Sequence, residues 1–231
     1  MAATGPWEAC LEMSVGRMET GRFDLHIHTF LSRDSLIDPR LLLKVAASKG
    51  LAGLAVTDHD AFGAHRMLGQ TSLIIVPGVE IRTNVGDVLA LFIEEPVKSR
   101  DVFEVCDRVR AQDGVLIAAH PFGFPRLGGN IGGEALRLLD GIEVFNARNL
   151  LQGQNEKALR LARRLGKAET GGSDAHSLRE VGKAYTLAAA SSLEELRLAI
   201  RSRATRGGGG LSSPLVHLAS FAAGIVHRLS H

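Results

Sequence analysis

Apolar and polar positions alternate along the stretch FDLHIH, residues 23–28, with the two-residue period of a β-strand. In a strand, the apolar side chains would share one face, and Asp24, His26 and His28 would share the other. Two imidazoles at alternate strand positions can reach one cation, but a half-buried strand with a polar outer face has the same pattern. The stretch alone therefore leaves both interpretations open.

Further along the chain, short apolar runs alternate with helix-like segments. The predicted strands are 22–28, 52–57, 73–81, 86–93, 115–119, 141–146, 168–172 and 184–189. The predicted helices are 39–49, 61–70, 99–112, 133–139, 152–165 and 193–202. Several strands are continuous apolar runs, as in parallel strands that are covered on both faces. This alternation predicts an α/β fold, either a parallel barrel or a doubly wound sheet.

The ends of the chain differ from its middle. Residues 1–21 lack the apolar core of a signal peptide, and we expect a disordered leader there, with Met18 as an alternative start. The α/β domain is expected over 22–206. The glycine run within 207–210 predicts a flexible linker. Beyond it, apolar residues at three- and four-residue spacing predict an amphipathic helix, so 207–231 is expected to be a linker and a C-terminal helix.

That helix is too short for a membrane span, and we expect it to pack on the barrel, with a dimer contact or a membrane-surface anchor as alternatives.

Of the 231 residues, 27 are Lys or Arg and 25 are Asp or Glu. This balance gives no sign of a nucleic-acid or membrane partner. Cys10 and Cys106 do not form a disulfide framework, which favours the cytoplasm.

Polar residues gather where the predicted strands meet loops. Asp58 and His59 follow the second strand, Glu80 ends the third, Asp87 opens the fourth, His120 ends the fifth, and Asp174 and His176 follow the seventh. In α/β barrels, the active site is built at the carboxyl ends of the strands. We therefore expect these residues and the FDLHIH histidines to converge on one site, as no single histidine would indicate by itself.

In chain order, the segments HIHTFLSRDS, VTDHD, PGVEI, GDVLALFI, AAHPFGFPR, IEVFNAR and GGSDAH closely resemble the motifs of the PHP family, named for polymerase and histidinol phosphatase. The resemblance runs from about Phe23 to Thr186. It implies a distorted seven-stranded (β/α)7 barrel, similar to a TIM barrel. It also implies up to three divalent metal ions at the carboxyl ends of the strands, Mn2+, Fe2+ or Zn2+, with Mg2+ as a further candidate.

The resemblance assigns metal ligands residue by residue. The implied ligands are His26, His28, Asp34, His59, Glu80, Asp87, His120, Asp174 and His176. Grouped by family likeness, His26, His28 and Asp174 hold one ion. Glu80 bridges to a second ion held by Asp87 and His120, and Asp34, His59 and His176 hold a third. Many relatives carry histidine where this chain has Asp87, and the harder aspartate shifts the preference from zinc toward manganese, iron or magnesium.

The resemblance implies a phosphoesterase that hydrolyses a small phosphorylated metabolite, such as a nucleotide, a sugar phosphate or a histidinol phosphate-like monoester. A metal-bound hydroxide would be the nucleophile. Glu80, Asp174 and His176 are the expected catalytic residues. The alternatives are a PHP-type nuclease acting on DNA or RNA ends, which the balanced charge disfavours, and a non-catalytic metal-binding domain, which the nearly complete ligand set disfavours.

Expectations for the surrounding residues rest on their position near the strand ends. Arg148, Asn146 and Arg126 are candidate substrate contacts, because a guanidinium can bind phosphate in a bidentate manner. The glycine-rich segment 128–133 is a candidate lid. Asp24 is expected to orient ligands rather than bind metal. Glu143 lies outside the ligand set, and we expect its replacement to have little effect on catalysis.

Overall fold

The computed structural model describes residues 20–123, 133–216 and 220. The strands in these ranges are β1 (Thr20–Asp24), β2 (Gly53–Val56), β3 (Ile74–Thr83), β4 (Gly86–Leu91), β5 (Val115–Ala118), β6 (Gly141–Asn146), β7 (Ala168–Gly172), β8 (Ala184–Ala189) and β9 (Arg206–Gly209). The helices are α2 (Pro39–Ser48), α3 (Val102–Arg110), α4 (Gly133–Leu138), α5 (Gln152–Leu165) and α6 (Leu193–Arg201), with the 3-10 helix η1 (Ala64–Met67).

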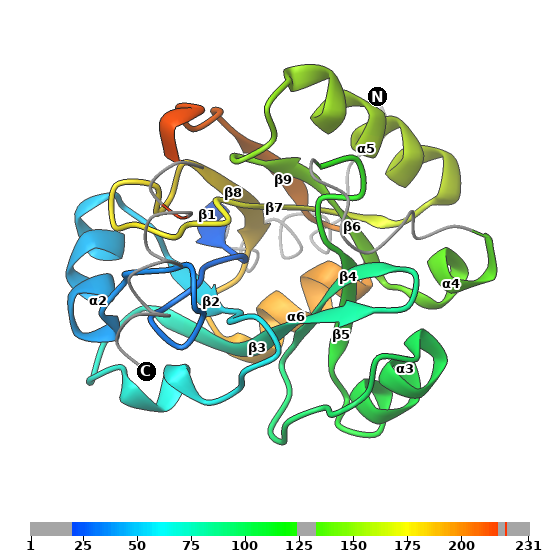
Figure 1. Cartoon of the computed structure of the whole chain (residues 1–231), viewed down its shortest axis with the longest axis horizontal. Coiled ribbons are helices and arrows are strands. Elements are labelled where there is room, and N and C mark those ends of the chain that lie inside the picture. The colour runs from blue at the N-terminus through cyan, green and yellow to red at the C-terminus, as the bar shows by residue number, and fades with distance from the viewer. Residues whose placement is uncertain (1–19, 124–132, 217–219, 221–231) are drawn as a thin grey trace, which may run out of the picture.

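The strands form one curled sheet in the order β7-β6-β5-β4-β3-β2-β1-β8-β9. Figure 1 shows the strands as a ring with α2, α3, α4 and α5 on its outside. The two edges of the sheet, β7 and β9, approach each other. Just before β9, the hydroxyl of Thr205 donates to the carbonyl of Glu169 on β7 at 2.8 Å, and the hydroxyl of Thr186 on β8 donates to the carbonyl of Gly171 on β7 at 3.0 Å. The molecule is therefore a distorted, nearly closed α/β barrel, with nine strands in the described residues rather than the seven expected.

The barrel interior is filled by apolar side chains and plugged at one end by α6. Leu196 and Ile200 of α6 are buried together with Leu89, Ile117 and other inward-facing residues of the strands. In Figure 1 this helix lies across the middle of the ring. Arg201 of α6 donates to the carbonyls of residues just before β5, so α6 lies at the amino ends of the parallel strands. The carboxyl ends remain available for a site.

The sheet is mixed, not parallel throughout as its apolar strands suggested. β4 is antiparallel to β3 and β5, and β8 is antiparallel to β1 and β9. Residues 84 and 85 alone connect β3 to β4, and so short a connection requires an antiparallel pair. As a result, the start of β4 lies at the same end of the barrel as the ends of β3 and β5.

The segment predicted as a flexible glycine linker forms strand β9 and pairs with β8. A Cβ at Gly207 would overlap the carbonyl oxygen of Thr170 on β7, so glycine here permits close backbone packing rather than flexibility. The predicted leader also ends earlier, because β1 begins at Thr20. The predicted helix 61–70 is reduced to η1, which follows Gly63 in a positive-φ conformation.

Several predicted segments lie mainly outside the described residues. These are the leader, the candidate lid at 128–133 and most of the C-terminal helix, of which residues 215, 216 and 220 are described as helical. None of the helices in the described part of the chain is both long and apolar enough to cross a membrane.

Candidate metal centre

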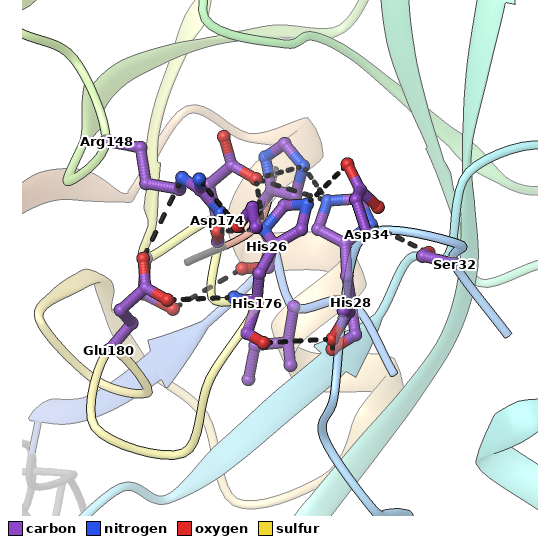
Figure 2. A network of polar contacts seen from close by, with 12 residues as sticks. His26, His28, Ser32, Asp34, Arg148, Asp174, His176 and Glu180 are labelled. Carbon is purple, nitrogen blue, oxygen red and sulfur yellow. Dashed lines mark hydrogen bonds and ion pairs between the residues drawn. The ribbon is translucent and has the colours of Figure 1, made fainter. Parts of the chain in front are cut away.

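Histidines and acids carried by five strands, or by the segments that follow them, meet at the carboxyl end of the barrel. They are His26, His28 and Asp34 after β1, His59 after β2, Glu80 in β3, His120 after β5, and Asp174 and His176 after β7. Each contacts at least one other member within 4 Å. Figure 2 shows five of them, His26, His28, Asp34, Asp174 and His176, with side chains turned toward one another.

His26 and His28 are fully buried at the centre of this cluster. β1 ends at Asp24, earlier than predicted, but the chain continues extended and pairs with the segment after β7. The main-chain N–H of His28 donates to the carbonyl of Ala175 at 3.0 Å, and that of Asp174 donates to the carbonyl of His26 at 2.8 Å. The barrel thus closes at the point where its histidines lie.

Three side chains have their Nδ1 fixed by neighbours. Nδ1 of His26 lies 3.0 Å from Oε1 of Glu143, and Nδ1 of His176 lies 2.8 Å from the main-chain carbonyl of Asp174. Nδ1 of His28 lies 3.2 Å from the hydroxyl of Ser32. When Nδ1 carries the proton and donates it, the Nε2 lone pair is left to bind a cation. In all three residues Nε2 faces the cluster.

Ser32 is an acceptor for His28 because its own proton is used elsewhere. Its hydroxyl donates to Oδ1 of Asp58 at 2.7 Å and accepts the main-chain N–H of His59 at 3.0 Å. Asp58 also accepts the N–H and the hydroxyl of Thr29. Through Ser32, Asp58 therefore helps to orient two ligand residues, His28 after β1 and His59 after β2.

Glu80 lies between the histidines, with a side chain that is 1% exposed. Its Oε1 is 3.0 Å from Nε2 of His120. Its Oε2 is 2.8 Å from Nδ1 of His59 but makes no hydrogen bond within the described structure. Burial raises the pKa of Glu80, but His59 and His26 outweigh it and hold the pKa well below its usual value. A buried carboxylate oxygen without a hydrogen bond, surrounded by imidazoles, is suited to a cation.

The side chain of Asp34 lies at the exposed edge of the cluster. Its Oδ2 is 3.3 Å from Nε2 of His176 and 3.6 Å from Nε2 of His59. Burial raises the pKa of Asp34, but hydrogen bonds from these two histidines hold it well below its usual value. Asp34 and His59 are 40% and 36% exposed, whereas His26, His28 and Glu80 are at most 1% exposed. The cluster therefore opens toward solvent on the side of Asp34 and His59.

Three sets of ligand atoms in the described residues lie within 4.8 Å of one another, close enough to share an ion. We name them the inner group (His26, His28, Asp174), the Glu80 group (His26, Glu80, His120) and the outer group (His28, His59, His176). Neutral imidazole and carboxylate together suit Mn2+, Fe2+ and Zn2+. The donor set therefore fits a multinuclear divalent metal site.

The charges of the clustered side chains also favour bound cations. Burial lowers the pKa of His26, but Glu143 and Asp174 outweigh it and raise that pKa well above 6.5. Burial also lowers the pKa of His59, but Glu80 raises it well above 6.5. The acids in the cluster thus require compensating positive charge, which divalent cations would supply.

The Glu80 group differs from the set that the resemblance implied, since it contains His26 and not Asp87. The carboxylate of Asp87 lies 3.7 Å from Nε of Arg82. Burial raises the pKa of Asp87, and the negative charge of Glu80 raises it further, so Asp87 lies close enough to the cluster to interact with it. Its place at the start of antiparallel β4 explains this proximity.

Two proposed ligands have strained main chains. His120 and Asp174 have φ angles of +25° and +54°, a region that side-chain-bearing residues rarely adopt. The N–H of His120 donates to Oε2 of Glu143 at 2.7 Å, and the N–H of Asp174 donates to the carbonyl of His26. Hydrogen bonds to other members of the site therefore stabilise both conformations.

The predicted substrate contacts differ in their surroundings. Asn146 is buried, and its Nδ2 donates to Oε2 of Glu143 at 3.0 Å and to Oδ2 of Asp174 at 3.3 Å. Nε of Arg148 lies 3.7 Å from Oε1 of Glu180, and its Nη2 donates to Ser220 at 2.9 Å. Figure 2 shows Arg148 and Glu180 beside the cluster. Arg126 lies outside the described residues.

Glu143 takes part in the site, which its position in the sequence did not predict. Its contacts with His26 and His120 make it unsuitable as the uninvolved residue that we expected. The available signal was its position on β6, where an acid stands between Ile142 and Val144, two residues of the apolar core. Asp24 accepts the N–H and hydroxyl of Ser173, the N–H of Gly182 and the main-chain N–H of His26, and within the described residues it has no hydrogen bond to an imidazole ring.

Comparisons with known proteins agree with this architecture. Residues 152–205 match the family model described as PHP-associated. An uncharacterized protein of Methanocaldococcus jannaschii, MJ0417, is 36% identical over 172 residues, which cover 71% of this chain and 69% of that protein.

Two solved structures are similar in fold. One is a two-domain protein from Bacteroides vulgatus that contains a predicted PHP-like metal-dependent phosphoesterase. It has a TM-score of 0.67 and 19% identity, over 89% of this chain and 70% of that chain. The other is the lesion-specific endonuclease EndoQ from Pyrococcus furiosus, with a TM-score of 0.59 and 16% identity, over 85% of this chain and 60% of that chain.

Proposed function

The chain belongs to the PHP domain family, and on that premise we propose that it is a metal-dependent phosphoesterase that hydrolyses a small phosphorylated metabolite. The observation that carries the proposal is the convergence of imidazole Nε2 atoms on buried Glu80 and on Asp174. Hydrolysis of a phosphate ester requires an activated water and compensation of charge on the phosphoryl oxygens and the leaving oxygen. Divalent cations bound here would supply both.

The residues that would hold the cations are the three groups, with Asp34 added to the outer group and Asp87 beside the Glu80 group. The chain's own contribution is to hold these ligands in place before substrate arrives. Glu80 contacts histidines of the Glu80 and outer groups and is proposed to join two cation positions. Asp174 and His176, with Glu80, complete the proposed catalytic set.

Substrate would approach from the side of Asp34 and His59, where the cluster is most exposed. Arg148 is the proposed contact for a phosphate oxygen, because a guanidinium can bind phosphate in a bidentate manner and this one lies close to the cluster. It lies beside Glu180, whose Oε2 accepts the main-chain N–H of His176. Asn146 acts through Asp174 in this scheme, and Arg126 remains a proposed contact.

A screen of the purified full chain tests the proposal. Release of phosphate is measured from nucleotides, sugar phosphates and histidinol phosphate, with Mn2+, Fe2+, Zn2+ or Mg2+ added in turn. We expect hydrolysis of at least one monoester with one of these metals and none after chelation. Absence of hydrolysis for every substrate and metal would contradict the proposal.

Nuclease activity is the second candidate, because the EndoQ endonuclease shares the fold. The same screen therefore includes single- and double-stranded oligonucleotides, one of them with an abasic lesion. The sequence carries 27 basic and 25 acidic residues, without the excess of positive charge that phosphate-backbone binding favours. We expect no cleavage, and cleavage faster than monoester hydrolysis would reverse the order of the two candidates.

A further inference from the structure

Glu143 lies in the middle of β6, is 1% exposed, and belongs to none of the three ligand groups. We propose that Glu143 is a positioning residue that serves the inner group and the Glu80 group together, and that its loss weakens cation binding in these two groups while sparing the outer group. The proposal rests on the proposed function insofar as the cluster must bind cations.

One carboxylate oxygen of Glu143 acts on a side chain. Oε1 lies 3.0 Å from Nδ1 of His26, so a proton on Nδ1 is held by a carboxylate and Nε2 keeps its lone pair. His26 belongs to both the inner group and the Glu80 group. The orientation of the buried imidazole of His26 therefore affects two cation positions.

The other oxygen acts on the main chain of the next ligand. Oε2 accepts the N–H of His120 at 2.7 Å, and His120 has a φ angle of +25°. A strained conformation persists only where surrounding contacts stabilise it. The imidazole of His120 in turn lies 3.0 Å from Glu80. Through this oxygen, Glu143 fixes the direction in which a second member of the Glu80 group points.

The packing around Glu143 leaves little room for another arrangement. A Cβ at Gly172 of β7 would overlap the Cβ of His26 and lie 3.0 Å from Oε1 of Glu143. Nδ2 of Asn146 occupies the remaining side of Oε2 at 3.0 Å. Gly172 thus permits the direct contact of His26 with Glu143, and the two side chains form one closely packed unit.

The outer group has separate supports. His28 is oriented by Ser32, and His176 by the main-chain carbonyl of Asp174. Asp34 contacts His59 and His176 directly. Among the described residues, the side-chain hydrogen bonds of Glu143 are to His26, His120 and Asn146, and none is to His59 or His176. This separation gives the proposal its distinctive consequence, which is unequal loss of cations.

Equilibrium dialysis against graded Mn2+ concentrations, followed by metal analysis of the protein, tests this on the full chain. In Glu143→Gln, one amide cannot accept the protons of both His26 and His120. We expect the affinity of the inner and Glu80 positions to fall by about 10–100-fold, as for other residues that orient ligands. The affinity of the outer group for Mn2+ should equal that of wild type.

Glu169→Gln is the matched control. Glu169 is a buried acid on neighbouring β7, and its carboxylate forms ion pairs with Arg163 and Arg206, which do not belong to the cluster. We expect its binding curve to match that of wild type. Glu143→Asp is the second variant, in case the first does not fold. It retains the charge but is one methylene too short to reach both histidines, so the same unequal loss is expected.

Three outcomes would count against the proposal. Wild-type binding curves for a folded Glu143→Gln or Glu143→Asp would overturn it. Equal weakening of every class of site would also overturn it, because Glu143 would then only support the fold. If wild type itself binds no Mn2+, Fe2+ or Zn2+, the proposed function fails first, and this proposal fails with it.

Discussion

The two ends of the barrel use charged residues in opposite ways. At the carboxyl end, Glu80 and His26 are buried and contact each other within 3.5 Å. At the amino end, Asp113 is exposed and pairs with Arg197 and Arg201 of α6. Solvent hydrates the second set and screens its interactions, whereas the first set has only its own members to compensate its charges.

This difference indicates where the chain accepts a cost for function. Buried carboxylates that repel one another would destabilise a site without bound cations. The left-handed main-chain conformations of the ligand residues His120 and Asp174 add a further cost. Exposed ion pairs at the other end contribute little to stability in either direction. Perturbation of the carboxyl end should therefore change both chemistry and stability, and perturbation of the amino end should change neither by much.

The largest expected effect follows substitution of Glu80. Glu80→Gln preserves the shape of the side chain but removes the charge proposed to join two cation positions. Turnover should fall at least about a hundredfold, equivalent to about 2.7 kcal/mol of transition-state stabilisation. Initial rates at saturating Mn2+ measure this, with Glu169→Gln as the comparison. A rate for Glu80→Gln near that of wild type would rule out the bridging role.

Removal of metal should have the next largest effect, on stability. A ligand at about 100 times its Kd stabilises the native state by about 2.7 kcal/mol. In a chain of this size, that corresponds to about 5–10 °C in Tm for each cation. Thermal unfolding with and without a chelator measures the shift, and added Mn2+ should restore the original Tm. An unchanged Tm after thorough chelation would contradict the metal-centre interpretation.

Asp24 offers a test through pH. Burial raises its pKa from 3.8 to about 6, although hydrogen bonds from Ser173 and Gly182 oppose the increase. Since the pKa of the folded state is the higher one, its contribution is fully present below about pH 4 and is lost as pH rises through 6. That contribution amounts to about 3 kcal/mol for a shift of this size.

Urea unfolding of metal-free wild type and Asp24→Asn between pH 4 and 7 measures this contribution. The stability of wild type relative to the variant should decline across the interval, because the variant has no carboxyl group to titrate at this position. Parallel curves for the two proteins would show that Asp24 keeps the same pKa on unfolding.

The smallest effect is expected at the amino end. Asp113 has a φ angle of +57°, which asparagine tolerates, so Asp113→Asn removes the charge and preserves the backbone. We expect Tm to fall by less than about 3 °C, turnover to be unchanged, and the shift to shrink at high salt. A shift as large as that caused by chelation would remove the contrast between the two ends.

The sequence predicted the alternation of strands and helices well, because each element carries its own local signal. Helix α2, for example, begins after Asp38, whose side chain accepts the N–H of Arg40, and has Pro39 in its first turn. The convergence of histidines followed from a second rule, that strands of an α/β barrel present their carboxyl ends together. Both inferences use residues that are close in sequence or share a position on a strand.

What escaped prediction depends on contacts between distant segments. The glycines at 207–209 have the composition of a linker, and only their approach to Thr170 and Ala184 makes them a strand. Glu143 acts through hydrogen bonds to His26 and His120, which are 117 and 23 residues away from it, and no spacing in the sequence encodes these contacts. Local patterns therefore identify candidate ligands, but not the residues that orient them.

The pairing of residues 26–28 with 174–175 has a consequence for the order of folding. These backbone hydrogen bonds join the first and the last of the proposed ligand segments, separated by most of the described chain. Contacts between segments so far apart carry a large loop-closure entropy and form slowly. A nascent chain on the ribosome would carry its early histidines exposed to water until β7 and the segment after it had emerged. We therefore expect the cation-binding site to form late in folding, in a single step together with closure of the barrel.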